Sequence, residues 1–174
     1  LANCKMRVTG AAPIDNETLM FFNNLGIPLT NIYGMSETTG AITVSNDVSP
    51  QIGKILPLTE VKILKKLKTD TVGEILVNGP TIFSGYYKNQ KETQNSFHNN
   101  LFKTGDLGYI DKSGYLHVVG RNKELIITKG GENIAPIPIE QMIKKYINNA
   151  MYIIVIGDKR KYLTALINIE KHKI

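Results

Sequence analysis

The strongest constraint on the fold is the order of short apolar runs along the sequence, which are separated by glycine, proline and polar turns. The most apolar run, Met151 to Ile156, has the length of a strand. No run reaches the roughly 18 residues that a membrane-spanning helix needs. A chain of 174 residues with 42% apolar content can bury one ordinary core or two small ones. We therefore expect a soluble protein of mixed α/β and α+β class, without internal repeats.

The first 45 residues have the order strand, helix, strand. A strand-like run at Lys5–Thr9 ends in a turn of glycine, alanine and proline, and Asp15 is a suitable N-cap for the next helix. Gly26 is expected to end that helix, and Leu29–Tyr33 to form the second strand. The helix carries the apolar residues Leu19, Met20 and Phe22. This order predicts an α/β segment over residues 1–52.

The pattern changes over residues 53–120, where strand-like runs follow one another. Val61–Leu64 and Glu74–Val77 are predicted strands. Tyr109–Ile110 and Tyr115–Val118 flank the turn DKSG and are expected to pair as a hairpin. We therefore expect a small antiparallel barrel or sheet in this part of the chain.

A third unit is predicted to begin near Arg121 and to be of α+β type. Pro136 and Pro138 are expected to stiffen the approach to its helix, and Glu140 to lie in the first helical turn, where the helix dipole favours a carboxylate. The predicted order is strand, helix, strand, strand, over Leu125–Thr128, Ile139–Ile147, Tyr152–Ile156 and Leu163–Ile169.

The net charge of +6 does not indicate a nucleic-acid-binding protein. The positive charge is almost all lysine, is scattered along the chain, and is not interleaved with aromatic residues. The single cysteine, Cys4, excludes an internal disulfide and is typical of a reducing compartment. The histidines, which are His98, His117 and His172, lie far apart in the sequence, so we expect neither a metal site nor a general base among them.

The segment Tyr33–Gly40, with the sequence YGMSETTG, has the residue types of a phosphate-binding loop. Its glycines let the backbone approach a phosphate closely, and its hydroxyl groups can donate to phosphate oxygens. Glu37 supplies a carboxylate of the kind that holds a magnesium ion shared with phosphate. An ordinary polar turn between two strands has a similar composition, so both interpretations stay open at this point.

Three further motifs carry weaker signals. Asp106 follows a glycine in FKTGD, where it can accept hydrogen bonds from ribose hydroxyls or simply form a turn. The charged stretch GRNKE, residues 120–124, stands where two units meet, which suits either a hinge or a solvated linker. Gly130 and Gly131 form a glycine turn between a predicted strand and a predicted helix.

The order and spacing of these motifs resemble the adenylate-forming superfamily of acyl-CoA synthetases, luciferases and peptide-synthetase adenylation domains. The stretch LFKTGDLGYIDKSGYLHVVGRNKELIITKGGENIAPIPIE, residues 101–140, is similar to the fatty acyl-CoA synthetase signature. GRNKELIITKGGENIAPIPIE and the later GDKRKYLTALINIE are most similar to the bubblegum-type long-chain branch. The resemblance covers essentially the whole chain.

The resemblance implies a ligase that uses ATP, Mg²⁺ and coenzyme A. In that family a fatty acid and ATP give an acyl-adenylate and pyrophosphate, and the thiol of CoA then displaces AMP. The implied site residues are Gly10, Ala11 and Ala12 along the adenine pocket, Tyr33 stacked on adenine, Gly34 and Ser36 at the phosphates, Glu37 as magnesium ligand, Asp106 and Arg121 at the ribose, Lys123 at the hinge between domains, and Gly130 and Gly131 in a loop beside the pantetheine tunnel.

The resemblance also implies a domain arrangement. Residues 1–120 would be the end of the large N-terminal domain, and residues 121–174 the start of the small C-terminal domain. The Ser/Thr/Gly-rich phosphate loop and the late lysine that serve adenylation in the family are absent from this sequence. We therefore expect a piece of a longer ligase that is inactive alone.

Two other functions are weighed against this one. An acyl-adenylating relative would pass its acyl group to a carrier protein or an amine. The sequence from Asp106 to Glu140, however, is similar to that of fatty acyl-CoA synthetases. A non-enzymatic nucleotide-binding module is supported only by the missing motifs. We expect an intracellular, cytoplasmic location, and an insoluble substrate is compatible with peripheral attachment to a membrane. No obligate protein partner is indicated.

Overall fold

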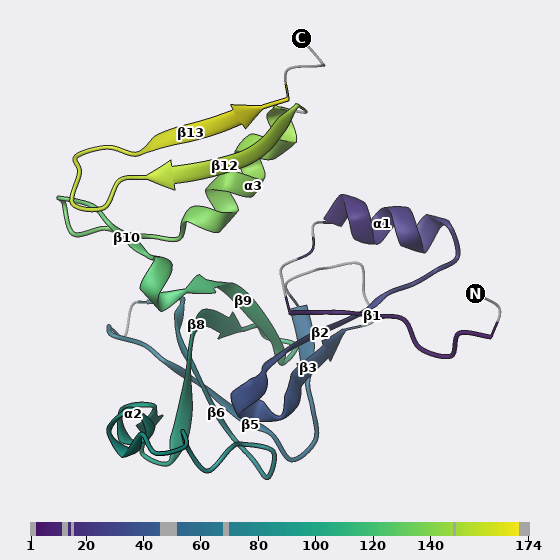
Figure 1. The fold of residues 1–174 in the computed structure, drawn as a ribbon, viewed down its shortest axis with the longest axis vertical. Helices are drawn as coiled ribbons and strands as arrows, with labels where there is room; N and C mark the ends of the chain where they lie inside the picture. The colour runs from purple at the N-terminus through teal and green to yellow at the C-terminus, as the bar shows by residue number, and fades with distance from the viewer. Residues whose placement is uncertain are drawn as a thin grey trace. The chain divides into compact units, whose positions relative to one another are not determined.

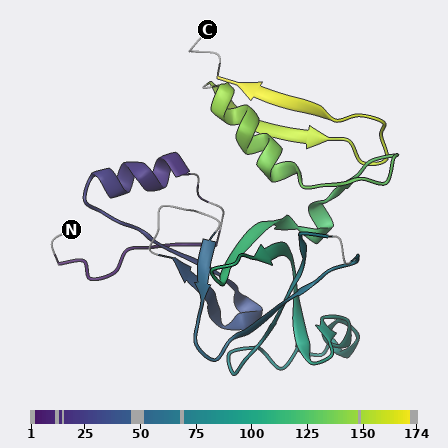
Figure 2. The same ribbon diagram turned by 180° about the vertical axis from the view of Figure 1, so that it is seen from behind.

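The computed structural model describes residues 3–11, 14, 16–45, 52–67, 70–147 and 149–170. The chain divides into two compact units, Leu1–Val118 and Val119–Ile174. Figures 1 and 2 show the elements of each unit from two opposite sides. The structure confirms the predicted mixture of α/β and α+β elements.

The first unit contains nine strands among the described residues, and they form one sheet. Along the main path the order is β1-β2-β3-β4-β9-β8-β6-β5, and β7 pairs with β8. Among the described residues of this sheet, β1 and β2 pair in parallel. The pairs β2–β3, β3–β4, β4–β9, β5–β6, β6–β8 and β7–β8 are antiparallel. The strands are β1 (Val8–Thr9), β2 (Thr30–Met35), β3 (Gly40–Ser45), β4 (Ile52–Ile55), β5 (Glu60–Leu64), β6 (Gly73–Asn78), β7 (Phe97–His98), β8 (Leu101–Ile110) and β9 (Tyr115–Arg121).

The first strand is shorter than predicted. β1 comprises only Val8 and Thr9, which pair with Thr30 and Asn31 of β2. β2 begins at Thr30, the partner of Val8, so it offers no strand residue to pair with the described residues before Val8. Met6 and Val8 are correspondingly exposed. The prediction of a strand from Lys5 was therefore wrong at its start.

The predicted helix is α1, Asn16–Asn24. It buries Leu19, whereas Met20 is exposed, so the apolar face is narrower than the sequence suggests. Gly26 has a φ of +70° just beyond the helix, as expected for a C-terminal glycine. The predicted N-cap, Asp15, lies outside the described residues.

The central strands follow the sequence pattern closely. β5 and β6 pair antiparallel, with Val61 opposite Val77, and β8 and β9 are neighbours joined by the predicted turn. Alternating side chains from these strands and from β3 pack together as the core of the unit. The core consists of Ile42, Ile75, Val77, Phe102 and Leu116. A short helix, α2 (Gln90–Asn95), precedes β7 and has Asn89 as its N-cap.

The second unit contains two described hairpins and a helix: β10 (Ile126–Ile127) with β11 (Asn133–Ile134), α3 (Pro136–Tyr146), and β12 (Ala150–Ile156) with β13 (Thr164–Ile169). Both views show α3 against one face of the β12–β13 pair (Figures 1 and 2). The predicted strands of this unit are confirmed, with small shifts of their ends.

The start of α3 differs from the prediction. The helix begins at Pro136, three residues before the expected Ile139, so both prolines lie inside its first turn. The first N–H groups of a helix have no partner within the helix, so proline is tolerated there. Glu140 therefore lies beyond the first turn. Its Oε1 accepts a hydrogen bond of 2.9 Å from the N–H of Val155, which joins α3 to β12.

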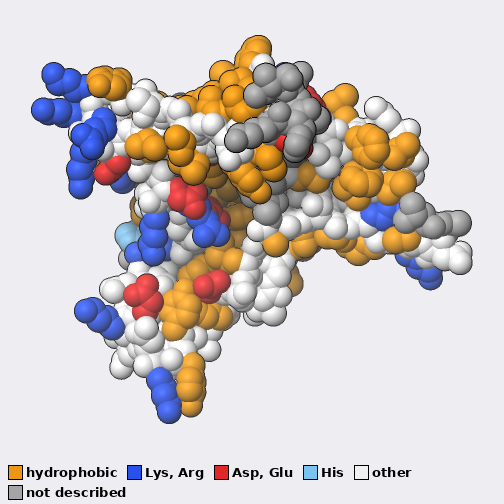
Figure 3. Space-filling model, turned by 45° about the horizontal axis from the view of Figure 1, so that its top comes forward, with side chains coloured by type: hydrophobic (Ala, Val, Ile, Leu, Met, Phe, Trp, Pro, Cys, Tyr) orange, Lys and Arg blue, Asp and Glu red, His pale blue; other side chains and the backbone are white. Residues whose placement is uncertain are grey.

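Several apolar side chains are open to solvent, and Figure 3 shows hydrophobic side chains at the surface. They include Met20, Phe21 and Leu25 near α1, and Tyr152, Ile154 and Leu166 on β12 and β13. None of the helices in the described part of the chain is long and apolar enough to cross a membrane.

Candidate functional site

The segment Tyr33–Gly40 forms a tight connection between β2 and β3. Ser36–Thr38 is a single 3-10 turn, and Thr39 follows with a φ of 58°. Thr38 is buried at the centre of the turn. Its hydroxyl accepts from the N–H of Met35 and lies within hydrogen-bonding distance of the carbonyl oxygens of Met35 and Gly40. The loop is therefore held by its own polar groups, with Ser36 exposed beside them.

Gly34 is required by the close approach of β2 and β3. A Cβ atom at this position would overlap the carbonyl oxygen of Gly40 and would lie 2.9 Å from the Cα of Ala41. The register between the two strands also shifts at Tyr33 and Gly34. Packing alone thus explains a glycine here, whatever else its backbone contacts.

Tyr33 and Asp106 are in direct contact although they are 73 positions apart. The hydroxyl of Tyr33 donates a hydrogen bond of 2.7 Å to Oδ2 of Asp106, which is 5% exposed. Asp106 lies on β8 after Gly105, whose φ of +75° favours glycine. The N–H of Asp106 donates to the hydroxyl of Thr104, which in turn donates to the carbonyl of Ile75 on β6. The structure therefore brings together two residues that the resemblance assigns to one nucleotide.

Glu37 also has a tyrosine partner. The hydroxyl of Tyr86 donates a hydrogen bond of 2.9 Å to Oε1 of Glu37. Burial raises the pKa of Tyr86, and its hydrogen bond to the Glu37 carboxylate and the charge of that group raise it further. The phenol therefore remains protonated, and a donor, at neutral pH.

Glu37 suits a metal ion that a bound ligand also coordinates better than a metal ion held by protein side chains alone. In the described part of the chain, no three His, Cys, Asp or Glu side chains gather closely enough to hold an ion. Mg²⁺ commonly takes one or two carboxylates and completes its shell with water and phosphate oxygens. A single half-buried carboxylate beside a hydroxyl-rich turn fits that mode of binding.

The alanine-rich turn after β1 is only partly described. A Cβ at Gly10 would lie 2.8 Å from Cγ1 of Ile32 and 3.0 Å from its carbonyl oxygen, so the approach of β2 excludes a side chain there. Ala11 is exposed and has a φ of 66°. Ala12 lies outside the described residues. Gly10 and Ala11 therefore follow directly after β1, which pairs with β2, the strand that carries Tyr33.

The other predicted site residues belong to the second unit, which the structure describes separately from the first. Lys123 is exposed in a 3-10 turn, and Arg121 is the residue before that turn. Gly130 and Gly131 lie in the tight turn between β10 and β11, closed by a 2.9 Å bond from the N–H of Gly131 to the carbonyl of Thr128. The structure thus brings Tyr33 and Asp106 together, while it does not place these four residues relative to them.

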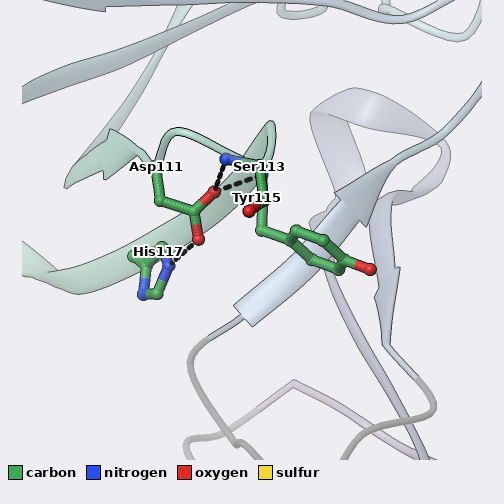
Figure 4. A network of polar contacts seen from close by, with 4 residues as sticks. All are labelled: Asp111, Ser113, Tyr115 and His117. Carbon is green, nitrogen blue, oxygen red and sulfur yellow. Dashed lines mark hydrogen bonds and ion pairs between the residues drawn. The ribbon is translucent and has the colours of Figure 1, made fainter.

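His117 has a partner that the sequence did not indicate. Its Nε2 lies 2.9 Å from Oδ2 of Asp111, and its ring stacks on Tyr109 with centroids 4.4 Å apart. Figure 4 shows the Asp111 carboxylate between this ring and the N–H groups of Ser113 and Tyr115, which donate to Oδ1. The bond from His117, and then the N–H groups of Tyr115 and Ser113, hold the pKa of Asp111 below its usual value.

Sequence reasoning missed Thr38, Thr104 and Tyr86. Thr38 and Thr104 support the site through hydroxyl bonds to the backbone, which no residue pattern distinguishes from ordinary strand threonines. Tyr86 is 49 positions from Glu37, so spacing cannot connect them. The only local signal is a Gly-Tyr pair just before α2.

Comparison with known proteins assigns the chain to a class. Residues 1–87 match the family model described as AMP-binding enzyme, and residues 123–174 match the model described as AMP-binding enzyme C-terminal domain. The chain therefore belongs to the AMP-binding enzyme family.

The similar proteins narrow this class. The chain is 43% identical to the long-chain-fatty-acid–CoA ligase heimdall of Drosophila melanogaster, over 97% of this chain and 25% of that protein. It is 39% identical to the human long-chain-fatty-acid–CoA ligase ACSBG2, over 98% of this chain and 26% of that protein. These relatives confirm the resemblance to the bubblegum-type branch. The chain spans about a quarter of the length of these curated relatives.

A solved structure supports the fold. The chain matches the O-succinylbenzoate coenzyme A synthetase of Bacillus subtilis, in complex with ATP and magnesium ion, with a TM-score of 0.80 and 32% identity. The match covers 94% of this chain and 36% of that one. The predicted fold class is thereby confirmed.

Proposed function

We propose that this chain is part of an ATP-dependent long-chain fatty acid:CoA ligase. The observation that carries the proposal is the hydrogen bond between Tyr33 and Asp106, two residues 73 positions apart that the family resemblance assigns to one nucleotide. The similarity to named long-chain ligases supports the fatty acyl substrate. The overall reaction joins a fatty acid to CoA through an acyl-adenylate and releases AMP and pyrophosphate.

Tyr33 and Asp106 would hold the nucleoside. The ring of Tyr33 stacks on adenine while its hydroxyl stays bound to Asp106, so one contact orients both side chains. The Asp106 carboxylate accepts from both ribose hydroxyls, with Arg121 assisting. Gly10, Ala11 and Ala12 offer backbone atoms to the edge of the adenine. The exposed position and positive φ of Ala11 support a turn that presents its backbone outward.

Gly34, Ser36 and Glu37 would hold the phosphates. Ser36 is exposed and its hydroxyl can donate to a phosphate oxygen, and Gly34 would contribute backbone atoms. Glu37 would be the protein ligand of Mg²⁺. When bound, this ion would neutralise the charge that develops on the α-phosphate as the acyl-adenylate forms and pyrophosphate leaves.

The second unit would change its position between the two half-reactions, which are adenylation and thioester formation. Lys123 marks the hinge about which residues 121–174 change position, and residues 1–120 form the end of the large domain. The turn at Gly130 and Gly131 lies beside CoA in the thioester-forming state. The exposure of Lys123 and the closed geometry of the turn are compatible with these roles.

On its own, the chain would form no acyl-CoA at a useful rate. It holds neither the Ser/Thr/Gly-rich phosphate loop nor the adenylation lysine of the family, and those groups stabilise the transition state of the first half-reaction. The longer protein that contains this chain would be active, in the cytoplasm or attached peripherally to a membrane.

Thioester formation by the full-length protein tests this function. With ATP, Mg²⁺, CoA and a long-chain fatty acid, we expect acyl-CoA, AMP and pyrophosphate in equal amounts. Asp106→Ala is expected to raise the KM for ATP at least tenfold, whereas the surface variant Tyr87→Phe leaves it unchanged. Acyl transfer to an amine or carrier protein in preference to CoA would contradict the proposal.

A further inference from the structure

We propose that Tyr86 is a positioning residue that holds the Glu37 carboxylate in the orientation needed for Mg²⁺ binding. This inference rests on the proposed function, because it assumes that Glu37 is the metal ligand. Tyr86 lies outside the segments Tyr33–Gly40 and Phe102–Asp106, whose residues are proposed to bind the nucleotide.

The segment Thr81–Tyr86 is bound to the loop that carries Glu37 at three points. The hydroxyl of Thr39 donates to the carbonyl of Thr81 at 2.6 Å. The N–H of Phe83 donates to the carbonyl of Glu37 at 2.9 Å. The Tyr86 hydroxyl donates to the Glu37 carboxylate itself, also at 2.9 Å. Both the backbone and the side chain of Glu37 are therefore fixed by one segment.

Tyr86 is itself held firmly. Its ring packs edge-on against Phe83, with centroids 4.9 Å apart, and Phe83 packs on the buried core residue Phe102. Its N–H donates to the hydroxyl of Thr93 in α2 at 2.9 Å, and its carbonyl accepts from Asn89 at 3.2 Å. The phenol oxygen is thus directed from the core of the unit toward Glu37.

The chemistry of this contact matches a supporting partner of a metal ligand. The phenol of Tyr86 donates its hydrogen bond to Oε1 of Glu37. The second oxygen of the carboxylate can then bind an ion. Ligating carboxylates are commonly hydrogen-bonded by such partners, and removing the partner typically weakens metal binding or activity about 10–100-fold. Tyr86 would therefore act through Glu37 and would not touch the substrate.

The adjacent Tyr87 is a matched control. It is 88% exposed, and its ring contacts Lys88, with Nζ 5.2 Å from the ring centroid. Tyr86→Phe and Tyr87→Phe each remove one phenolic oxygen and keep the ring. A difference between these variants therefore reports the contact with Glu37.

The test is a Mn²⁺ titration of the full-length protein, followed by electron paramagnetic resonance, with a non-hydrolysable ATP analogue present. We expect Tyr86→Phe to raise the Kd of Mn²⁺ about tenfold, and Tyr87→Phe to leave it unchanged. Tyr86→Phe should also raise the Mg²⁺ concentration for half-maximal ATP–pyrophosphate exchange, while excess Mg²⁺ restores the rate. Affinity for the nucleotide without metal should stay at the wild-type value.

Three outcomes would overturn the inference. The first is a Kd for Mn²⁺ in Tyr86→Phe equal to that of the wild type. The second is an equal further loss when Tyr86→Phe is added to Glu37→Ala, because Tyr86 would then act independently of Glu37. The third is a wild-type protein that binds neither Mn²⁺ with the analogue nor exchanges pyrophosphate, which would refute the proposed function together with the inference.

Discussion

At the scale of single residues, two tyrosine–carboxylate contacts organise the candidate site. Tyr33 and Tyr86 each direct a phenolic hydroxyl at a carboxylate from a distant part of the chain, Asp106 and Glu37. The phenolic oxygens lie 2.7 Å from Oδ2 of Asp106 and 2.9 Å from Oε1 of Glu37. Both carboxylates are thereby given a defined orientation before any ligand binds.

The Tyr33→Phe variant tests the first of these contacts. Because the Asp106 carboxylate is buried, removing the hydroxyl should lower the free energy of unfolding by about 2 kcal/mol, measured by urea denaturation of the chain. Tyr87→Phe, at an exposed position, should change it by less than about 0.5 kcal/mol. Equal stability of the two variants would mean that the Tyr33–Asp106 bond contributes nothing.

The Asp111 network predicts a dependence of stability on pH. Folding lowers the pKa of Asp111 below its ordinary value of 3.8, chiefly through the bond from His117. The ionised form is therefore favoured in the folded state, so its stabilisation is complete above pH 3.8 and is lost as the pH falls through the folded-state pKa.

Asp111→Asn should accordingly lower the melting temperature at pH 6, and the difference from the wild type should shrink below about pH 4. The measurement is thermal denaturation across this range, with Glu17→Gln on the exposed face of α1 as the control. A difference that stays constant down to pH 2 would show that the Asp111 carboxylate does not titrate with folding.

At the scale of elements, the loop between β2 and β3 depends on the close approach of two backbones. Gly34→Ala would place a Cβ against the carbonyl of Gly40 and force the strands apart. We expect a loss of about 2–3 kcal/mol of stability by urea denaturation. Gly130→Ala should have little effect, because the nearest atom to its Cβ would be the Thr128 hydroxyl at 3.7 Å. Similar losses for both would contradict the steric argument.

In the second unit, the side chain of Glu140 joins α3 to β12. Glu140→Ala would leave the N–H of Val155, a buried residue, without its acceptor at the edge of β12. We expect a loss of about 1–3 kcal/mol, and a smaller loss for Glu140→Gln, which keeps an acceptor oxygen. Hydrogen exchange at Val155 should quicken in the alanine variant. Unchanged exchange would show that the bond does not protect the strand.

At the scale of the whole molecule, local patterns in the sequence predicted the elements better than their ends. The β5–β6 pair and the β12–β13 pair were predictable because apolar runs of strand length flank a nearby turn. The short β1 was not, since its length depends on how far β2 offers a partner. The two prolines do not mark the start of α3, because the first turn of a helix tolerates proline.

The residues of the candidate site were also predictable only in part. Tyr33, Glu37 and Asp106 were recognisable through the family resemblance, but their partners were only partly so. The contact of Tyr86 with Glu37 spans 49 positions and depends on the packing of Phe83 against the core. Such a contact follows from tertiary structure alone.

The activity proposed for the full-length protein is the adenylation of fatty acids. ATP–pyrophosphate exchange by the full-length protein, without CoA and across fatty acids of graded length, tests it most directly. We expect exchange that requires a long-chain fatty acid and Mg²⁺, and that falls at least tenfold in Asp106→Ala. Exchange with none of the fatty acids would contradict it.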